Sequence, residues 1–265
     1  MTSHPKFSLA GRRALLTGAG GAIGSVLAQG IAESGAAVVV QDLDATRVDP
    51  LCEAIRSNGG TAHSIGSDLA DVATCRETVE QATSLLGGLD LVVTCAGINR
   101  RKPIVEVTAE DFDAIVAVNM RSVYFISQAA YEPLKASGHG AIVHLSSLSA
   151  RFSFNSISVY AATKAAVSSM TRSFAREWAA DGIRVNCIEP SVVKTEFTKP
   201  LWGEPHRERW FDHTTPLGRL SAPDEMLGAV LFLASDASSY ITGQSIVIDG
   251  GILAGADWDN YRTMP

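Results

Sequence analysis

Apolar and polar positions along the chain follow two alternating patterns. Short apolar runs rich in β-branched residues are separated by longer segments in which apolar positions recur every three or four residues. Runs of the first kind are typical of buried parallel strands, and segments of the second kind are typical of amphipathic helices. The pattern therefore predicts seven strands, at residues 14–17, 37–41, 61–66, 91–94, 141–145, 184–188 and 245–248.

The regular alternation of strand and helix predicts an α/β fold. We expect one doubly wound domain over residues 1–265, with a seven-stranded parallel sheet and helices on both faces. The alternation fails only between Pro190 and Pro216. A connection of this length in a compact domain is commonly a lid or binding loop, so residues 190–216 are the predicted substrate lid. A surface excursion without function is the alternative.

Composition limits the classes of function. The chain has 22 Lys and Arg against 28 Asp and Glu, a net charge of −6 that argues against non-specific binding of nucleic acid. The four cysteines form no C-x-x-C and the histidines form no H-E-x-x-H, so neither a disulfide framework nor a metal site is predicted. With no apolar targeting or spanning segment, we expect a cytoplasmic protein that does not bind membranes.

A glycine-rich turn follows the first predicted strand, and a helical pattern follows the turn. Glycines let the backbone approach a pyrophosphate closely, and the free N–H groups of a helix start stabilise its negative charge. This order is that of a Rossmann dinucleotide site, although such a loop also occurs as a simple tight turn. The predicted pyrophosphate contacts are Gly18, Gly20, Gly21, Ile23 and Gly24.

Asp42 follows the second predicted strand, eighteen residues beyond Gly24. A carboxylate there can accept both ribose hydroxyls of an adenosine, although it can also be a turn residue. A 2′-phosphate ~4 Å away would cost about 2 kcal/mol, roughly 30-fold discrimination against NADP. Because neither Gly21 nor Leu43 is basic, the predicted cofactor is NAD.

Tyr160 and Lys164 lie four residues apart on a predicted helix, hence on one face. A lysine charge ~5 Å from the phenol would lower its pKa by about 2 units and bring it toward neutrality. Many Tyr-x-x-x-Lys pairs are only structural. Here Ser147 ends a buried strand thirteen residues before Tyr160, where a hydroxyl can polarise a substrate carbonyl.

Together these residues resemble the short-chain dehydrogenase/reductase family over nearly the whole chain. The resemblance implies that Tyr160 exchanges a proton with the substrate, Lys164 lowers its pKa and holds the nicotinamide ribose, Ser147 orients the carbonyl and Asn119 supports a proton relay. It also implies a homotetramer built on pairs of long helices. Further cofactor contacts implied by the resemblance are Asp68, Leu69, Ala96, Gly97, Tyr160, Lys164, Pro190, Val193 and Thr195.

Four positions depart from the family pattern. Ala22 stands in place of a glycine near the pyrophosphate. Thr94 and Cys95 stand where the family has two asparagines, whose hydrogen bonds must be replaced or lost. Ser191 replaces the glycine after Pro190. None of these changes removes a candidate catalytic group.

Cations near the predicted crevice suggest the substrate. Arg100 and Arg101 follow the fourth strand, Arg151 lies four residues beyond Ser147, and Trp202 lies on the predicted lid. Guanidinium groups suit carboxylates, although a solvated surface would also explain them. The Gly-Ile-x-Arg-Arg stretch resembles the sugar-acid branch of the family, which acts on substrates such as gluconate.

The sequence thus predicts an NAD-dependent oxidoreductase that transfers a hydride between nicotinamide and a secondary alcohol or ketone of a small sugar acid or polyol. A 3-oxoacyl thioester reductase or another ketone reductase of the same family is the alternative. More remote alternatives are a non-catalytic dinucleotide sensor and a nucleotide-sugar epimerase or dehydratase. The chain length of 265 residues argues against the epimerase or dehydratase.

Overall fold

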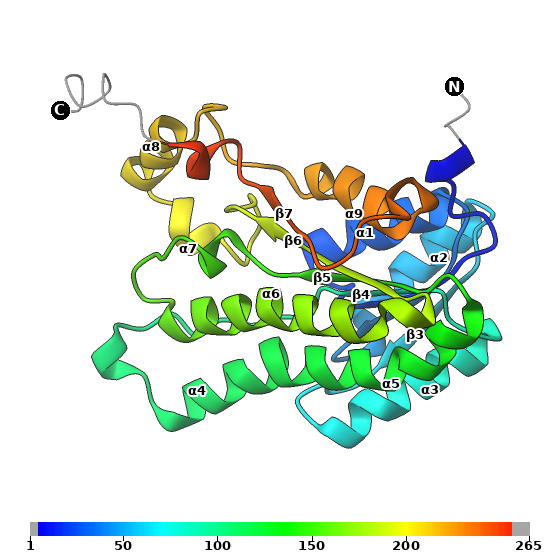
Figure 1. The fold of residues 1–265 in the computed structure, drawn as a ribbon. Helices are drawn as coiled ribbons and strands as arrows, with labels where there is room; N and C mark the ends of the chain where they lie inside the picture. The colour runs from blue at the N-terminus through cyan, green and yellow to red at the C-terminus, as the bar shows by residue number, and fades with distance from the viewer. Residues whose placement is uncertain (1–4, 256–265) are drawn as a thin grey trace.

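Seven parallel strands form a single sheet through the middle of the molecule (Figure 1). The computed structural model describes residues 5–255. The predicted seven-stranded sheet is confirmed, and β2 and β6 extend one and two residues further than predicted. The strands are β1 (Arg13–Thr17), β2 (Ala37–Asp42), β3 (Ala62–Gly66), β4 (Leu91–Thr94), β5 (Ala141–Leu145), β6 (Arg184–Pro190) and β7 (Ser245–Ile248).

Helices cover both faces of the sheet, as the pattern predicted (Figure 1). Because side chains alternate along a strand, Leu16 of β1 packs into one layer and Leu15 into the other. The first layer holds α1 (Ala22–Glu33), α2 (Asp49–Ser57) and α9 (Leu227–Ala234). The second holds α3 (Val72–Leu86), α5 (Ser122–Ser137) and α6 (Ser158–Trp178), and α4 (Ala109–Val116) runs into α5 through a π-helical turn.

The strand order shows where a ligand crevice is expected. The order is β3-β2-β1-β4-β5-β6-β7, so the chain reverses direction across the sheet between β1 and β4. Ligands of such sheets bind beyond the carboxyl ends of the strands at this switch point. The ends of β1, β2, β4, β5 and β6 carry the candidate residues to that edge.

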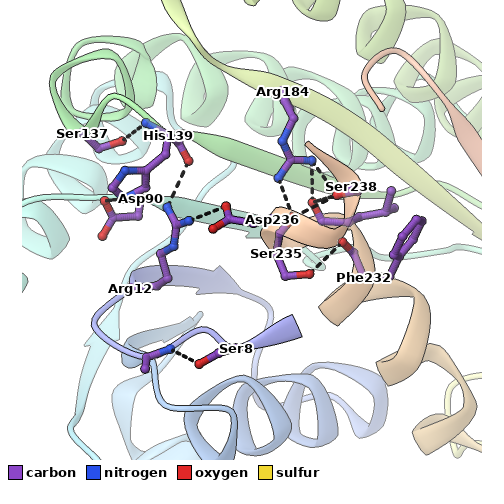
Figure 2. Close-up of polar contacts among 12 residues, drawn as sticks. Ser8, Arg12, Asp90, Ser137, His139, Arg184, Phe232, Ser235, Asp236 and Ser238 are labelled. Atoms are coloured by element: carbon purple, nitrogen blue, oxygen red, sulfur yellow. Dashed lines mark hydrogen bonds and ion pairs between the residues drawn. The ribbon is translucent and has the colours of Figure 1, made fainter. Parts of the chain in front are cut away.

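The opposite, amino edge of the sheet is held by polar contacts (Figure 2). Arg12 pairs with Asp236 at 2.7 Å, and His139 Nε2 lies 3.0 Å from the buried Asp90. Arg184 donates to the carbonyl of Leu233 at 2.9 Å. These contacts join residues far apart in the chain and fix the strand starts, because charged hydrogen bonds are the stronger ones.

The segment between β6 and β7 contains two helices that the sequence pattern did not predict. They are α7 (Lys199–Trp202) and α8 (Pro205–Thr214). The ring of Phe154, in the loop after β5, lies 6.0 Å from Phe211 and 6.2 Å from Trp210 of α8. These aromatic contacts dock the segment over the carboxyl edge of β5. Within residues 5–255, the helices are all too short or too polar to cross a bilayer.

Candidate active site

The glycine turn after β1 is packed so closely that side chains are excluded. Gly18 has φ +68°, and a Cβ there would lie 2.5 Å from Ala96 Cα. A Cβ on Gly24 would lie 2.3 Å from the carbonyl oxygen of Gly18. Gly21 precedes α1 without a side-chain cap, so the first N–H groups of the helix face the turn. This cradle of bare backbone fits a pyrophosphate.

Asp42, the last residue of β2, lies buried beside this turn. Its carboxylate accepts from the N–H of Gly20 at 2.9 Å and from Leu43 N–H at 2.9 Å. Arg47 also donates to it, at 2.5 Å. Sequence reasoning missed Arg47, because it considered only the positions flanking the turn and the strand. The acceptor set fits an adenosine ribose, and Arg47 reduces the net negative charge that a 2′-phosphate would meet.

Ser147, Tyr160 and Lys164 converge beyond the carboxyl end of β5. Ser147 follows β5 in extended conformation, and its Oγ accepts from Ser149 N–H at 3.0 Å. Lys164 Nζ lies 5.6 Å from the centre of the Tyr160 ring and donates to the Leu145 carbonyl at 2.7 Å. Tyr160 and Lys164 lie one turn apart on α6, so helix geometry brings both to the strand that carries Ser147.

The electrostatics of this trio differ from the sequence estimate. Burial raises the pKa of Tyr160, and a hydrogen bond with Ser147 and the charge of Arg101 partly oppose that rise. Burial also lowers the pKa of Lys164 to about 8. The pKa of Tyr160 thus shifts in the opposite direction to the one expected from Lys164 alone, because desolvation penalises the phenolate.

Asn119 lies in the π-helical turn Ala117–Arg121 and holds the segment after β4. Its Oδ1 accepts from Ile98 N–H at 2.8 Å, and its Nδ2 donates to the Ile98 carbonyl at 2.9 Å. A Cβ on Gly97 would lie 3.5 Å from Asn119 Oδ1 and 3.8 Å from Lys164 Nζ. The structure thus brings Asn119 and Lys164 together around Gly97.

The segment after β4 sends alternate side chains to opposite sides. Arg101 and Asn99 face a small pocket, whereas Arg100 and Lys102 both contact Asp111 at the start of α4, at 3.3 and 2.5 Å. Several contacts lower the pKa of Asp111 to about 2, and the hydrogen bond from Lys102 has the largest effect. The pocket is lined by Asn99, Arg101, Ser147, Leu148, Ser149, Phe154, Ile157, Tyr160, Ser191, Val192, Phe197, Thr198 and Leu201.

Arg101 is the cation that reaches this pocket. Its guanidinium lies 6.0 Å from the centre of the Phe197 ring, and its Nη1 is buried without a hydrogen-bond partner. Burial lowers the pKa of Arg101, but an arginine keeps its charge. Tyr160 lies near enough for the two groups to interact electrostatically.

The other predicted substrate residues have partners elsewhere. Arg151 pairs with Glu189, a buried residue of β6. Trp202 donates from Nε1 to Thr198 Oγ1 at 3.1 Å. Arg100, Arg151 and Trp202 are therefore absent from the pocket lining, and among the three predicted arginines only Arg101 is brought to Tyr160.

The remaining predicted cofactor residues lie along the carboxyl edge. Asp68 accepts from Ala70 N–H at 2.9 Å, and Leu69 is buried. Pro190 ends β6, and Val193 beyond it is buried and forms a bridge with Ser221. Thr195 Oγ1 lies 3.1 Å from Thr198 Oγ1.

A buried pair replaces one of the asparagines that the family pattern has after β4. Thr94 Oγ1 lies 2.9 Å from Nδ1 of His144 on β5, and burial lowers the pKa of His144 to about 3. The imidazole is thus neutral, and sequence reasoning did not single it out. Cys95 makes no such contact, and burial raises its pKa to about 12. Residues 5–255 place no group of three His, Cys, Asp or Glu side chains where they could hold a metal ion.

Known proteins resemble this chain over nearly its whole length. A family model described as enoyl-(acyl carrier protein) reductase matches residues 18–253. Gluconate 5-dehydrogenase of Gluconobacter oxydans is 35% identical over 251 residues, 94% of this chain and 98% of that protein. A tropinone reductase homolog of Arabidopsis thaliana is 37% identical over 253 residues, 95% and 96% of the two chains. A solved gluconate 5-dehydrogenase from Burkholderia cenocepacia, in complex with NADP and tartrate, is 36% identical with a TM-score of 0.91, and the match covers 95% and 98%.

Proposed function

Because the chain belongs to the short-chain dehydrogenase/reductase family of oxidoreductases, we propose that it transfers a hydride between NAD and the secondary alcohol or ketone carbon of a small sugar acid. A neutral polyol is the second candidate within the same class. The observation that carries the proposal is the pocket that joins Arg101, with its unpartnered buried N–H, to Ser147 and Tyr160. A partly buried cation beside a proton-transfer group suits a hydroxylated carboxylate.

In the oxidation direction, the substrate carbon gives up a hydride and its hydroxyl gives up a proton. The bound nicotinamide supplies the hydride acceptor. Tyr160, as the phenolate, takes the hydroxyl proton, so the O–H bond breaks as the carbonyl forms. Ser147 holds the same oxygen by a hydrogen bond, and Lys164 stabilises the phenolate by its charge. In the reduction direction Tyr160 returns the proton.

The residues around the glycine turn suit the dinucleotide. Gly18, Gly21 and Gly24 leave bare backbone for the pyrophosphate, and Asp42 offers acceptors to the ribose. Asp42 supports a preference for NAD. Arg47, paired with that carboxylate, weakens the discrimination below the roughly 30-fold expected of an unpaired charge.

The identity of the substrate is proposed from charge. Among residues 5–255, no Asp or Glu lines the pocket, so this part of the chain offers Arg101 no carboxylate to pair with there. An unpaired charge that is partly buried still costs free energy, and a substrate carboxylate would reduce that cost. Gluconate 5-dehydrogenases among the relatives, one of them in complex with tartrate, support the same class. An acyl thioester would leave the guanidinium unpaired, which disfavours the 3-oxoacyl alternative.

The test compares an acid with its uncharged analogue. Absorbance at 340 nm follows reduction of NAD⁺ by D-gluconate and by D-sorbitol, for the wild type and for Arg101→Met. Losing a charged hydrogen bond of about 1.5–3 kcal/mol should raise KM for gluconate roughly 10- to 150-fold and affect sorbitol little. Arg76→Met, on an exposed position of α3, is the control. Equal effects on both compounds would remove the carboxylate from the proposal, and turnover of a 3-hydroxyacyl thioester alone would replace it.

A further inference from the structure

Two polar atoms in the proposed substrate pocket lack a hydrogen-bond partner among the described residues. Within residues 5–255, four buried side-chain nitrogen or oxygen atoms make no hydrogen bond: Asn99 Oδ1, Arg101 Nη1, His144 Nε2 and Ser221 Oγ. Asn99 and Arg101 line the same pocket as Tyr160. Buried polar groups of native proteins are almost always paired, so a shared pocket with two unpaired groups indicates a polar ligand there.

The two groups have opposite hydrogen-bonding character. The guanidinium of Arg101 only donates, whereas Oδ1 of Asn99 only accepts. Arg101 therefore suits a carboxylate, and Asn99 needs an O–H or N–H donor beside it. A carboxylate cannot serve Asn99 Oδ1, because an ionised carboxylate has no proton to donate.

The spacing of the two residues limits how far apart the ligand groups can be. Asn99 and Arg101 are two residues apart, so their Cα atoms are at most ~7 Å apart. Both side chains point to the same side of the segment, away from Asp111. The groups they contact must be close neighbours along the substrate.

Several other residues that line the pocket cannot accept a hydrogen bond from a substrate hydroxyl. Leu148, Ile157 and Val192 present apolar walls. The hydroxyl of Thr198 is already engaged, because it donates to the Val193 carbonyl and accepts from Trp202 Nε1. Neither these apolar walls nor the Thr198 hydroxyl can satisfy a substrate hydroxyl group beside the carboxylate.

We propose that Asn99 is a specificity-determining residue that accepts a hydrogen bond from the hydroxyl group on the carbon next to the carboxylate that Arg101 binds. The inference rests on the proposed function and narrows its substrate class to 2-hydroxy sugar acids. An analogue without that hydroxyl leaves Asn99 Oδ1 buried and unpaired, which sites of this kind reject. A matching substrate pairs both groups at once.

The experiment uses D-gluconate and 2-deoxy-D-gluconate, which differ by this hydroxyl alone. The wild type should favour gluconate by about tenfold or more in kcat/KM. Asn99→Leu, which keeps the size of the side chain and removes the acceptor, should reduce this preference to about twofold. The change should come from a higher KM for gluconate, with turnover of the deoxy acid retained. Asn58→Leu, on the exposed turn after α2, is the matched control.

The outcomes separate this inference from the proposed function. If both acids are oxidised but the wild type shows no preference, or if Asn99→Leu keeps the preference, the assignment of Asn99 is overturned and the proposed function stands. An equal loss on both acids would show a structural role and also overturns it. If neither acid is oxidised with either NAD⁺ or NADP⁺, the proposed function fails, and the assignment of Asn99 fails with it. The wild-type comparison requires no variant and therefore does not depend on how Asn99→Leu folds.

Discussion

Tyr160 is the residue on which the proposed proton transfer depends. Replacing it with Phe removes the hydroxyl and keeps the ring, so the fold and cofactor binding should change little. We expect kcat to fall by at least two to three orders of magnitude, because proton transfer loses its donor and acceptor. Stopped-flow or steady-state absorbance at 340 nm measures the loss, and calorimetry with NAD⁺ checks binding. More than about a tenth of the activity in the variant would contradict the assignment.

Tyr160 should also determine how the activity of the wild type depends on pH. Oxidation needs the phenolate, and burial raises the pKa of Tyr160. The value of kcat/KM for oxidation should therefore rise with pH through the neutral range and continue rising into alkaline solution. Reduction needs the protonated phenol and should show the opposite trend.

Arg47 should decide how strictly the protein distinguishes NAD from NADP. Its guanidinium neutralises Asp42 and can also approach a 2′-phosphate, since its side chain is half exposed. Arg47→Ala should therefore strengthen the preference for NAD⁺ by about tenfold, the value of one charged hydrogen bond. The ratio of kcat/KM for NAD⁺ and NADP⁺ measures it, with Arg76→Ala as control. An unchanged ratio would show that Arg47 has no part in the choice, and a wild type that prefers NADP⁺ would overturn the NAD proposal.

At this scale the sequence identifies residues in fixed motifs but not residues that act through contacts. Ser147, Tyr160 and Lys164 stand out because helix and strand periodicity puts them at one edge. Arg100 and Arg101 look equivalent in the sequence. The structure distinguishes them, because Arg100 forms an ion pair with Asp111. Arg47 is missed for the same reason.

At the scale of elements, the buried strands are predictable from the sequence and helices α7 and α8 are not. Strands such as β4 and β5 are short apolar runs with every residue buried, so their composition alone marks them. Helix α8 is polar on most sides and buries only Phe211, and α7 has four residues. Neither has an apolar stripe that periodicity could detect. The π-helical turn around Asn119 is also invisible to periodicity, because it lies inside a continuous helical pattern.

A buried polar network joins β5, β6 and α6 behind the candidate site. Glu189 accepts from Ser168 Oγ at 2.7 Å and pairs with Arg151. Ser168 Oγ lies 2.8 Å from Ser146 Oγ, which donates to the Lys164 carbonyl at 2.7 Å. The network ties the backbone beside Ser147 to the helix that carries Lys164. Arg151 therefore supports the site from behind.

Arg151→Met should destabilise the protein, because it leaves Glu189 buried without its counter-charge. Since Arg151 is half exposed and water can reach the pair, we expect a loss of about 1–3 kcal/mol in the free energy of unfolding. Adding Glu189→Gln should recover part of the loss, because an amide needs no counter-charge. Urea unfolding at fixed protein concentration measures both, with Arg76→Met on the exposed face of α3 as control. A variant with unchanged stability and a raised KM for gluconate would restore Arg151 as a substrate contact.

At the scale of the whole molecule, the amino and carboxyl edges of the sheet differ in the kind of contacts they hold. Salt bridges and backbone contacts of Arg12, His139 and Arg184 fix the amino edge (Figure 2). The carboxyl edge holds the glycine turn, the candidate proton-transfer residues and the pocket that Phe197 and Leu201 help to line. The sequence predicts the carboxyl edge because its motifs are local. At the amino edge, Arg12 contacts residues more than a hundred positions away, which no local pattern marks.

One outer surface of the molecule is suited to another copy of the chain. Helix α6 exposes a stripe of small residues, Ala162, Ala165, Ser169 and Ser173, at spacings of three and four. Beside it, α4 exposes Phe112, the π-helical turn exposes Met120, and α5 exposes Tyr124. Small residues allow close helix approach, and exposed apolar rings favour burial. This surface supports the homotetramer that the sequence resemblance implies.

Light scattering at micromolar concentration tests the assembly directly. The wild type should have about four times the 28.0 kDa mass of one chain. Ala165→Arg with Ser169→Arg places two charges where the helices would meet, and burying them unpaired costs several kcal/mol, so the variant should dissociate. Ser84→Arg, on the exposed face of α3, should leave the mass unchanged. A wild-type mass of one chain would contradict the assembly. A double variant that keeps the full mass would move the interface away from α6, because two unpaired arginines cannot remain in a closely packed helix pair.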